Sequence, residues 1–241
     1  LDHEWKLYST SCSDFLNKIN NSEQTKYTLV DIPTTTTLIH KHIQPIVGSC
    51  VLTELLTMHN MQYRKYHRAW LVEWMLEQAE QLQLELSKTQ LLALIFHNVI
   101  YVPGVGQNEL ICAQLFKKFV SEFPVKLTPA EEQHVVQLLQ DMGTRKSNTH
   151  ESALILDLLM LPLAATGVEL CAWEELIWLE NKHLMDRENA RKDFDTRRLK
   201  YVLSLAKEKL FNQLTQFEPT ARVNLEGLRQ AWVKRYNNSK T

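Results

Sequence analysis

Glycine and proline are scarce in this sequence, at 6 and 7 of 241 residues. A turn-rich all-β fold of this length needs more of both, because these two residues make many of the tight turns. Long stretches rich in leucine, glutamine, glutamate and lysine are present instead, and these residues favour helix. The sequence therefore predicts an all-α fold.

A net charge is also missing, because 27 basic residues face 28 acidic ones and leave a formal charge of -1. Without an overall positive field, we expect neither nucleic acid nor an anionic membrane as a partner. No apolar run reaches the length of a membrane span, and the longest candidate, Leu154 to Ala165, is interrupted by Asp157 and Pro162. These absences favour a globular protein that binds proteins or small molecules.

Paired cysteines are the third absence. Cys12, Cys50, Cys112 and Cys171 are far apart and lack the spacing of a zinc site or a secreted disulfide framework. Reduced, mostly buried thiols and a cytoplasmic location are therefore expected. The sequence also has no Gly-rich phosphate loop, no His-Glu-x-x-His pair and no Gly-x-Ser-x-Gly turn.

Two regions differ in composition. Residues 1–37 form a polar arm rich in serine, threonine and asparagine, and residues 38–241 carry apolar residues at helical spacing and form one domain. The pattern predicts roughly nine helices, over 38–59, 65–84, 87–101, 109–123, 129–142, 151–165, 169–185, 193–213 and 219–236. Ser87 and Thr128 are predicted N-caps, and Gly143 and Gly167 are predicted C-caps.

Three short blocks carry the most informative pattern. They read Arg64-Lys65-Tyr66-His67, then Phe96-His97-Asn98-Val99-Ile100-Tyr101, then Asn108-Glu109-Leu110-Ile111-Cys112-Ala113. In this order they resemble the small predicted metal-dependent phosphohydrolases of the HD superfamily, whose blocks read Arg-x-Tyr-His-x-x-x-His, His-Asp-x-x-Tyr and Asn-Glu-x-x-Ser-Ala. The ending from Leu210 to Leu225 is similar as well. The resemblance implies an HD-domain-like helical bundle.

The resemblance also implies a metal site in which two histidines and two aspartates from separate helices converge. This sequence departs from that set at three places, where Leu71, Asn98 and approximately Pro162 stand in the ligand positions. Only His97 keeps a ligand type. We therefore expect His67, Leu71, His97, Asn98 and Pro162 to line the remnant of a metal site, with no catalytic residue and no bound metal.

Other residues of the blocks are candidates for ligand binding. Arg64 and His67 could meet an anionic ligand, and Asn108 and Glu109 are further candidates. The last two also suit a helix N-cap followed by a first-turn acid, and that structural role is sufficient for them. A rebuilt site from His59, Glu73, His150 or Asp157 lacks helical spacing to the other positions.

Three functional hypotheses follow from these observations. The leading one is an HD phosphohydrolase-like pseudoenzyme that serves as a binding or regulatory module, without a cofactor, for a small phosphorylated ligand or a protein partner. The first alternative is a divergent phosphohydrolase that acts on a nucleotide or small phosphate ester with manganese, magnesium or nickel. The second is a structural interaction domain of a larger assembly, which the polar arm favours.

Overall fold

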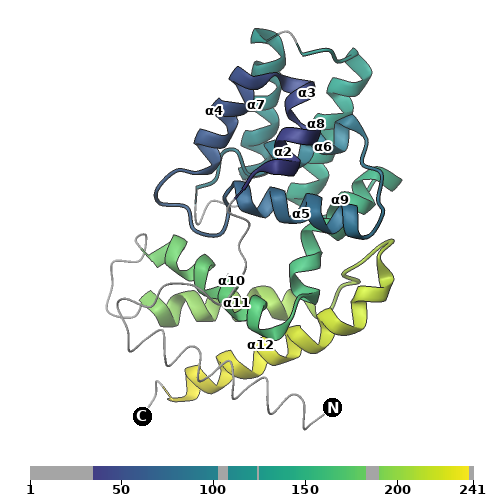
Figure 1. Ribbon diagram of the computed structural model, residues 1–241. Coiled ribbons are helices and arrows are strands. Elements are labelled where there is room, and N and C mark those ends of the chain that lie inside the picture. Colours follow the sequence, from purple (N-terminus) through teal and green to yellow (C-terminus); the bar gives the residue numbers. More distant parts are fainter. Residues whose placement is uncertain (1–34, 103–107, 124, 183–189, 239–241) are drawn as a thin grey trace. The chain divides into compact units, whose positions relative to one another are not determined.

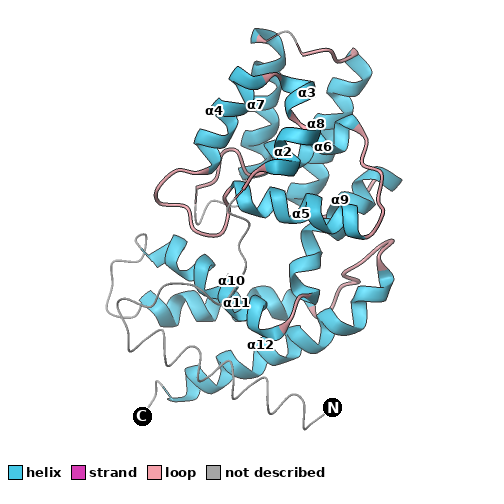
Figure 2. Cartoon of the chain, viewed as in Figure 1, coloured by secondary structure: helices cyan, strands magenta, loops and turns pink. Residues whose placement is uncertain are grey.

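The computed structural model describes residues 35–102, 108–123, 125–182 and 190–238, with side chains of the last helix described to Lys234. Within these ranges the regular structure is entirely helical, so the predicted all-α class is confirmed (Figures 1 and 2). Eleven α-helices are described, nine of them with seven residues or more. They belong to two compact units, one spanning Ile32–Leu159 and one containing Met160–Thr241. We call these the N-terminal and the C-terminal unit.

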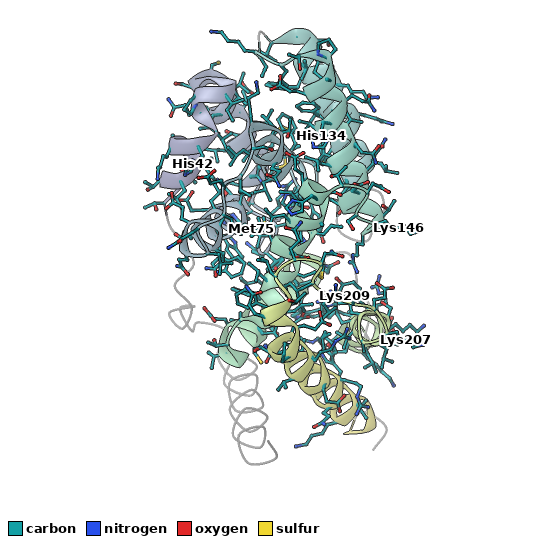
Figure 3. The ribbon with its side chains drawn as sticks, turned by 90° about the vertical axis from the view of Figure 1, so that its right-hand side faces the viewer. His42, Met75, His134, Lys146, Lys207 and Lys209 are labelled. Carbon is teal, nitrogen blue, oxygen red and sulfur yellow. The ribbon has the colours of Figure 1, made fainter. Side chains whose placement is uncertain are left out.

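The N-terminal unit is built around one almost completely buried helix. Its helices are α2 (Thr37–His42), α3 (Gln44–Val47), α4 (Ser49–His59), α5 (Ala69–Gln81), α6 (Lys88–Phe96), α7 (Asn108–Glu122), α8 (Pro129–Thr144) and α9 (His150–Met160). Every residue of α6 from Thr89 onward is buried, and α5, α7 and α8 pack against it (Figure 1). A helix that is apolar on all sides belongs in the centre of a bundle. Met75 of α5, fully buried, points into the same core (Figure 3).

The helix predicted over residues 38–59 is broken into α2, α3 and α4. Pro45 lies in the first turn of α3, where its missing N–H costs nothing. Gly48 separates α3 from α4 with a φ of 83°, a conformation that L side chains rarely adopt. The periodicity survives both breaks, which is why the sequence pattern alone predicted one helix.

The predicted N-caps are confirmed, whereas both predicted C-caps are wrong. Ser87 and Thr128 each form a complete capping box. Gly143 lies inside α8, where its lack of a side chain allows close packing, because a Cβ there would be 3.1 Å from Cβ of Glu109. Gly167 is the first residue of the next helix rather than the end of the previous one. Arg145, in the left-handed conformation, ends α8 instead.

The C-terminal unit contains η1 (Leu161–Ala164), α10 (Gly167–Asn181), α11 (Ala190–Leu205), η3 (Thr215–Phe217) and α12 (Glu218–Asn238). The α-helix α9 stops at Met160 and a 3-10 turn with Pro162 in its first positions follows, as expected for proline in a helical run. Helix α12 packs against α11 and η1. Lys207 and Lys209 follow α11 on the exposed side of this unit (Figure 3).

Main-chain contacts explain the C-terminal part of the sequence resemblance. Arg222 donates to the carbonyls of Leu205 and Ala206 and so caps the end of α11. Asn224 donates 2.8 Å hydrogen bonds to the carbonyls of Leu163 and Ala165 at the end of η1. Both residues therefore hold helix ends in place.

One cysteine differs from the sequence-based expectation. Cys50 and Cys112 are free, but Cys171 is disulfide-bonded. The prediction of reduced thiols is therefore wrong at Cys171, because separation along the sequence does not limit which cysteines meet in the fold.

The described helices were also tested for membrane spans. No single one of them is long and apolar enough to cross a membrane, although the pair His150–Ala164 and Gly167–Asn181 passes by length and composition together.

Candidate functional site

Five consecutive carbonyl groups after α6, from Asn98 to Val102, are held by side chains from other parts of the N-terminal unit. We call residues 98–102 the held segment. The donors are Arg64 to Asn98 and Val99, Cys112 to Ile100, Tyr63 to Tyr101 and Asn108 to Val102. Main-chain groups that leave a helix must find partners, and here side chains supply them. This explains why the helix predicted to Tyr101 ends at Phe96.

Arg64 is the central residue of this arrangement and is only 1% exposed. Its Nη1 donates to the carbonyl of Asn98 at 2.5 Å and to that of His67 at 3.3 Å, and its Nη2 donates to Val99 at 2.9 Å. The carboxyl end of a helix carries partial negative charge, which favours a cation there. Arg64 thereby joins the first sequence block to the second.

The third block is joined to the second by two side chains. Asn108 accepts from the amide of Val102 at 2.9 Å and donates to its carbonyl at 3.2 Å. This pairing corrects the interpretation of Asn108 as a simple N-cap, because its side chain bonds outside α7. Cys112 stands where the HD pattern has serine, and its Sγ donates to Ile100 at 3.3 Å. Burial raises the pKa of the Cys112 thiol to about 11, so the thiol stays protonated and can donate.

His97 and Asn98 form a pair that is closed on itself. His97 Nδ1 donates to the carbonyl of Leu94 at 2.6 Å, which leaves the lone pair on Nε2. Nδ2 of Asn98 lies 2.6 Å from that nitrogen and donates to it. Burial lowers the pKa of His97 to about 3, so its imidazole is neutral. The only ligand-type residue kept from the family pattern therefore has both ring nitrogens occupied.

His59, at the end of α4, lies in the same region. It is fully buried, and its Nε2 is 2.7 Å from the carbonyl of Ile95. Burial lowers the pKa of His59 to about 4, and the positive charges of Arg64 and His67 add to the effect. His59 and His67 also lower the pKa of His97. These mutual effects place the three imidazoles near one another.

His67 is the more accessible member of this group. Its ring is half-buried and stacks on Tyr101 with ring centroids 3.8 Å apart and an interplanar angle of 20°. Tyr66 meets the same ring edge-on at 4.9 Å. Lys65 beside it is exposed and Arg68 is partly exposed. The surface here therefore combines aromatic rings with positive charge.

The predicted site residues divide between the two units. His67, His97 and Asn98 come together around Arg64, and Leu71 is buried in the first turn of α5, which packs against α6. Pro162 lies in η1 of the C-terminal unit. Its predicted place beside the other four stays a prediction.

The candidates for a rebuilt site have other surroundings. Glu73 is 1% exposed, and its carboxylate accepts from the amides of Leu38 and Ile39 at 2.7 and 2.9 Å, so it caps the first turn of α2. Asp157 is buried in α9, and His150 is exposed at the start of that helix. These positions belong to different helices from the histidines around Arg64.

A divalent metal does not fit the donor atoms around His97. The Nε2 lone pair accepts the Asn98 amide, and Leu71 offers no donor atom. Within the described ranges, no three His, Cys, Asp or Glu side chains are arranged to hold a metal ion. We therefore derive no chemical step through a metal.

Sequence reasoning missed two residues of the site. Tyr63 is partly exposed and looked like an ordinary surface residue, and Cys112 was treated only as a buried thiol. The signal for Cys112 was present, because it occupies the serine position of the third block. Tyr63 has no local signal, since its partner Tyr101 is 38 residues away. No family model, curated protein or solved structure matches this chain.

Proposed function

We propose that this chain is a non-catalytic binding or regulatory module that resembles the HD phosphohydrolases. The closed pair of His97 and Asn98 is the observation that carries the proposal, because it uses the lone pair that a metal would need. The hydrogen bonds that join the three sequence blocks support an HD-like arrangement. A working hydrolase of this type needs a metal to generate its nucleophile at neutral pH.

The ligand class follows from the charge beside the held segment. Residues 60–72 contain Arg64, Lys65, His67 and Arg68 and no acidic residue. Lys65, His67 and Arg68 reach the surface to different extents, next to Tyr101. Such a surface favours a small anionic ligand, and phosphate oxygens suit lysine and arginine donors. A small phosphorylated molecule is therefore the proposed ligand.

The first experiment tests the absence of catalysis. Purified protein should contain less than a stoichiometric amount of divalent metal by elemental analysis. It should also leave phenyl phosphate intact in the presence of manganese, magnesium or nickel. A tightly bound metal equivalent, or metal-dependent hydrolysis, would favour the alternative of a divergent phosphohydrolase.

The second experiment tests the ligand. Titration with inorganic phosphate and with phenyl phosphate, followed by NMR, should shift the ring signals of His67 and Tyr101. Arg68→Gln should weaken binding about tenfold, the effect of losing one charge-assisted hydrogen bond. Lys117→Gln, an exposed lysine of α7, is the matched control and should bind as the wild type does. Equal binding by both variants contradicts this site.

A repair experiment tests the resemblance itself. Asn98→Asp alone should bind no metal and should destabilise the fold, because it buries a carboxylate opposite the lone pair of His97. Adding Leu71→His should make the melting temperature rise with added metal. An unchanged melting temperature in the double variant would show that these positions do not surround one site.

Two further expectations belong to the proposal. A protein partner, as for an interaction domain of a larger assembly, is the second candidate, and the exposed Met61, Tyr63 and Val102 favour it. A cytoplasmic location was predicted from the cysteine spacing, and the disulfide of Cys171 argues against it, since such bonds are rare in reducing compartments.

A further inference from the structure

Two buried polar atoms near the end of α6 have no hydrogen-bond partner, and they are chemically complementary. One is Nε of Arg64, a donor, and the other is Nδ1 of His59. Their side chains belong to residues that are 1% and 0% exposed. An unsatisfied buried polar atom costs about 1–3 kcal/mol, so two of them in one region call for an explanation.

The tautomer of His59 follows from its partner. A carbonyl oxygen can only accept, so the 2.7 Å contact with Ile95 means that Nε2 carries the hydrogen. In the neutral ring, Nδ1 then carries a lone pair and needs a donor. Nε of Arg64 always carries a hydrogen and needs an acceptor. The two requirements match in sign.

The two side chains are held close to each other from both ends. Five positions separate them in the sequence. His59 holds the carbonyl of Ile95 and Arg64 holds that of Asn98, one helical turn further on, where the rise is about 5 Å. The charge of Arg64 also acts on His59 electrostatically. One water molecule spans a donor and an acceptor roughly 5 Å apart, because each hydrogen bond is about 2.8 Å long.

We propose that one water-sized hydroxylic molecule, a water in the purified protein, bridges Arg64 Nε and His59 Nδ1. It accepts from the guanidinium and donates to the imidazole. The result is a continuous polar chain from the carbonyl of Asn98 through Arg64, the water and His59 to the carbonyl of Ile95. Buried waters of this kind satisfy groups that the protein leaves unpaired. The bridge ties the end of α4 to the end of α6, and it does not depend on the proposed function.

The experiment is NMR on the full chain, labelled with ¹³C and ¹⁵N. We expect magnetisation transfer from a long-lived water to the His59 ring protons and to the Arg64 Nε–H. We also expect a ¹⁵N shift at His59 Nδ1 that is typical of a hydrogen-bonded acceptor. His97 is the internal control, because Asn98 already satisfies its lone pair, and its ring should show no such water.

Three outcomes overturn the inference. The first is the shift of a free lone pair at His59 Nδ1, and the second is a lack of any long-lived water contact at His59. The third is loss of the water signal at His59 on addition of inorganic phosphate, which would identify the occupant as an exchangeable anion. The variant His59→Gln keeps an acceptor and a donor, so retention of the water signal at Arg64 in this variant adds support.

Discussion

The two units satisfy their buried charges in different ways. In the N-terminal unit, Arg64 donates to carbonyl groups at the end of α6 and Glu73 accepts amide groups at the start of α2. In the C-terminal unit, buried glutamates on α10 pair with arginines on α11. Arg191 is 3.0 Å from Glu175, and Arg198 pairs with Glu174.

The difference teaches which contacts depend on the exact backbone. Main-chain dipoles cannot move once the helices are packed, so a charge bound to them has no substitute partner. Ion pairs between helices are adjustable and screened, and the side chains of Arg191 and Arg198 are 32% and 19% exposed. Loss of a charge should therefore be more damaging in the N-terminal unit.

The largest expected effect is for Arg64→Leu. It leaves the carbonyls of Asn98 and Val99 without their donor inside the core, which should cost roughly 3 kcal/mol or more of unfolding free energy. Urea unfolding followed by tryptophan fluorescence measures the cost. Arg68→Leu, at a partly exposed position of the same segment, is the control and should cost less than about 1 kcal/mol. Equal costs would break the comparison.

Acid should destabilise the N-terminal unit through its buried histidines. Folding lowers the pKa of His59 to about 4 and that of His97 to about 3, from 6.5. The unfolded chain therefore binds more protons, and this stabilisation is complete above pH 6.5. It is lost as the pH falls through about 4 and about 3, at about 1.4 kcal/mol per pH unit for each proton.

Hydrogen exchange of the α6 amides between pH 7 and pH 4 measures this loss. His97→Gln should reduce the slope by one proton if the variant folds. His40→Gln, on the exposed side of α2, should leave the slope unchanged. A wild-type slope of zero over this range would show that the buried histidines are not neutral in the fold.

Glu73→Gln tests the buried acid of the same unit. A neutral amide offers one acceptor oxygen where the carboxylate offers two, so one amide of α2 loses its partner. The expected cost is about 1–2 kcal/mol. Faster hydrogen exchange at Leu38 and Ile39 would locate it. Glu54→Gln, on the exposed side of α4, should be neutral.

The C-terminal ion pair should contribute less. A double-mutant cycle with Glu175→Gln and Arg191→Met should give a coupling of about 1 kcal/mol or less, weaker at high salt. The cycle is needed because Arg191 also lies over the Trp178 ring at 4.8 Å. A coupling above the cost of Arg64→Leu would reverse the ranking of the two units.

The smallest expected effect concerns a helix end. Gln83 follows α5 with a φ of 56°, and the amides of Gln83 and Leu84 bond to Glu80 and Ala79 as in a Schellman motif. Gln83→Gly should stabilise the N-terminal unit by about 0.5–1 kcal/mol, because glycine adopts this conformation without strain. The melting temperature measures the gain. Gln83→Ala, which keeps the strain, should show none.

Local chemistry was predicted well from the sequence. The capping boxes at Ser87 and Thr128 span only three residues, so their partners are visible in the sequence. The C-caps at Gly143 and Gly167 were wrong, because a glycine also serves close helix packing or the first position of a helix. The end of α6 was missed for a related reason. Its carbonyls are held by Arg64, 34 positions earlier in the sequence.

The sequence by itself determined the helical class, the buried character of α6 and the three blocks in which the site residues occur. Apolar periodicity and the scarcity of glycine and proline are enough for this, since they act within one or two helical turns. Only the tertiary structure decided which atoms satisfy each polar group. It closed His97 on Asn98, placed Arg64 on the held segment and used Glu73 as a cap for another helix. These partners are set by the packing of helices far apart in sequence, because every buried polar group must find a partner wherever the fold provides one.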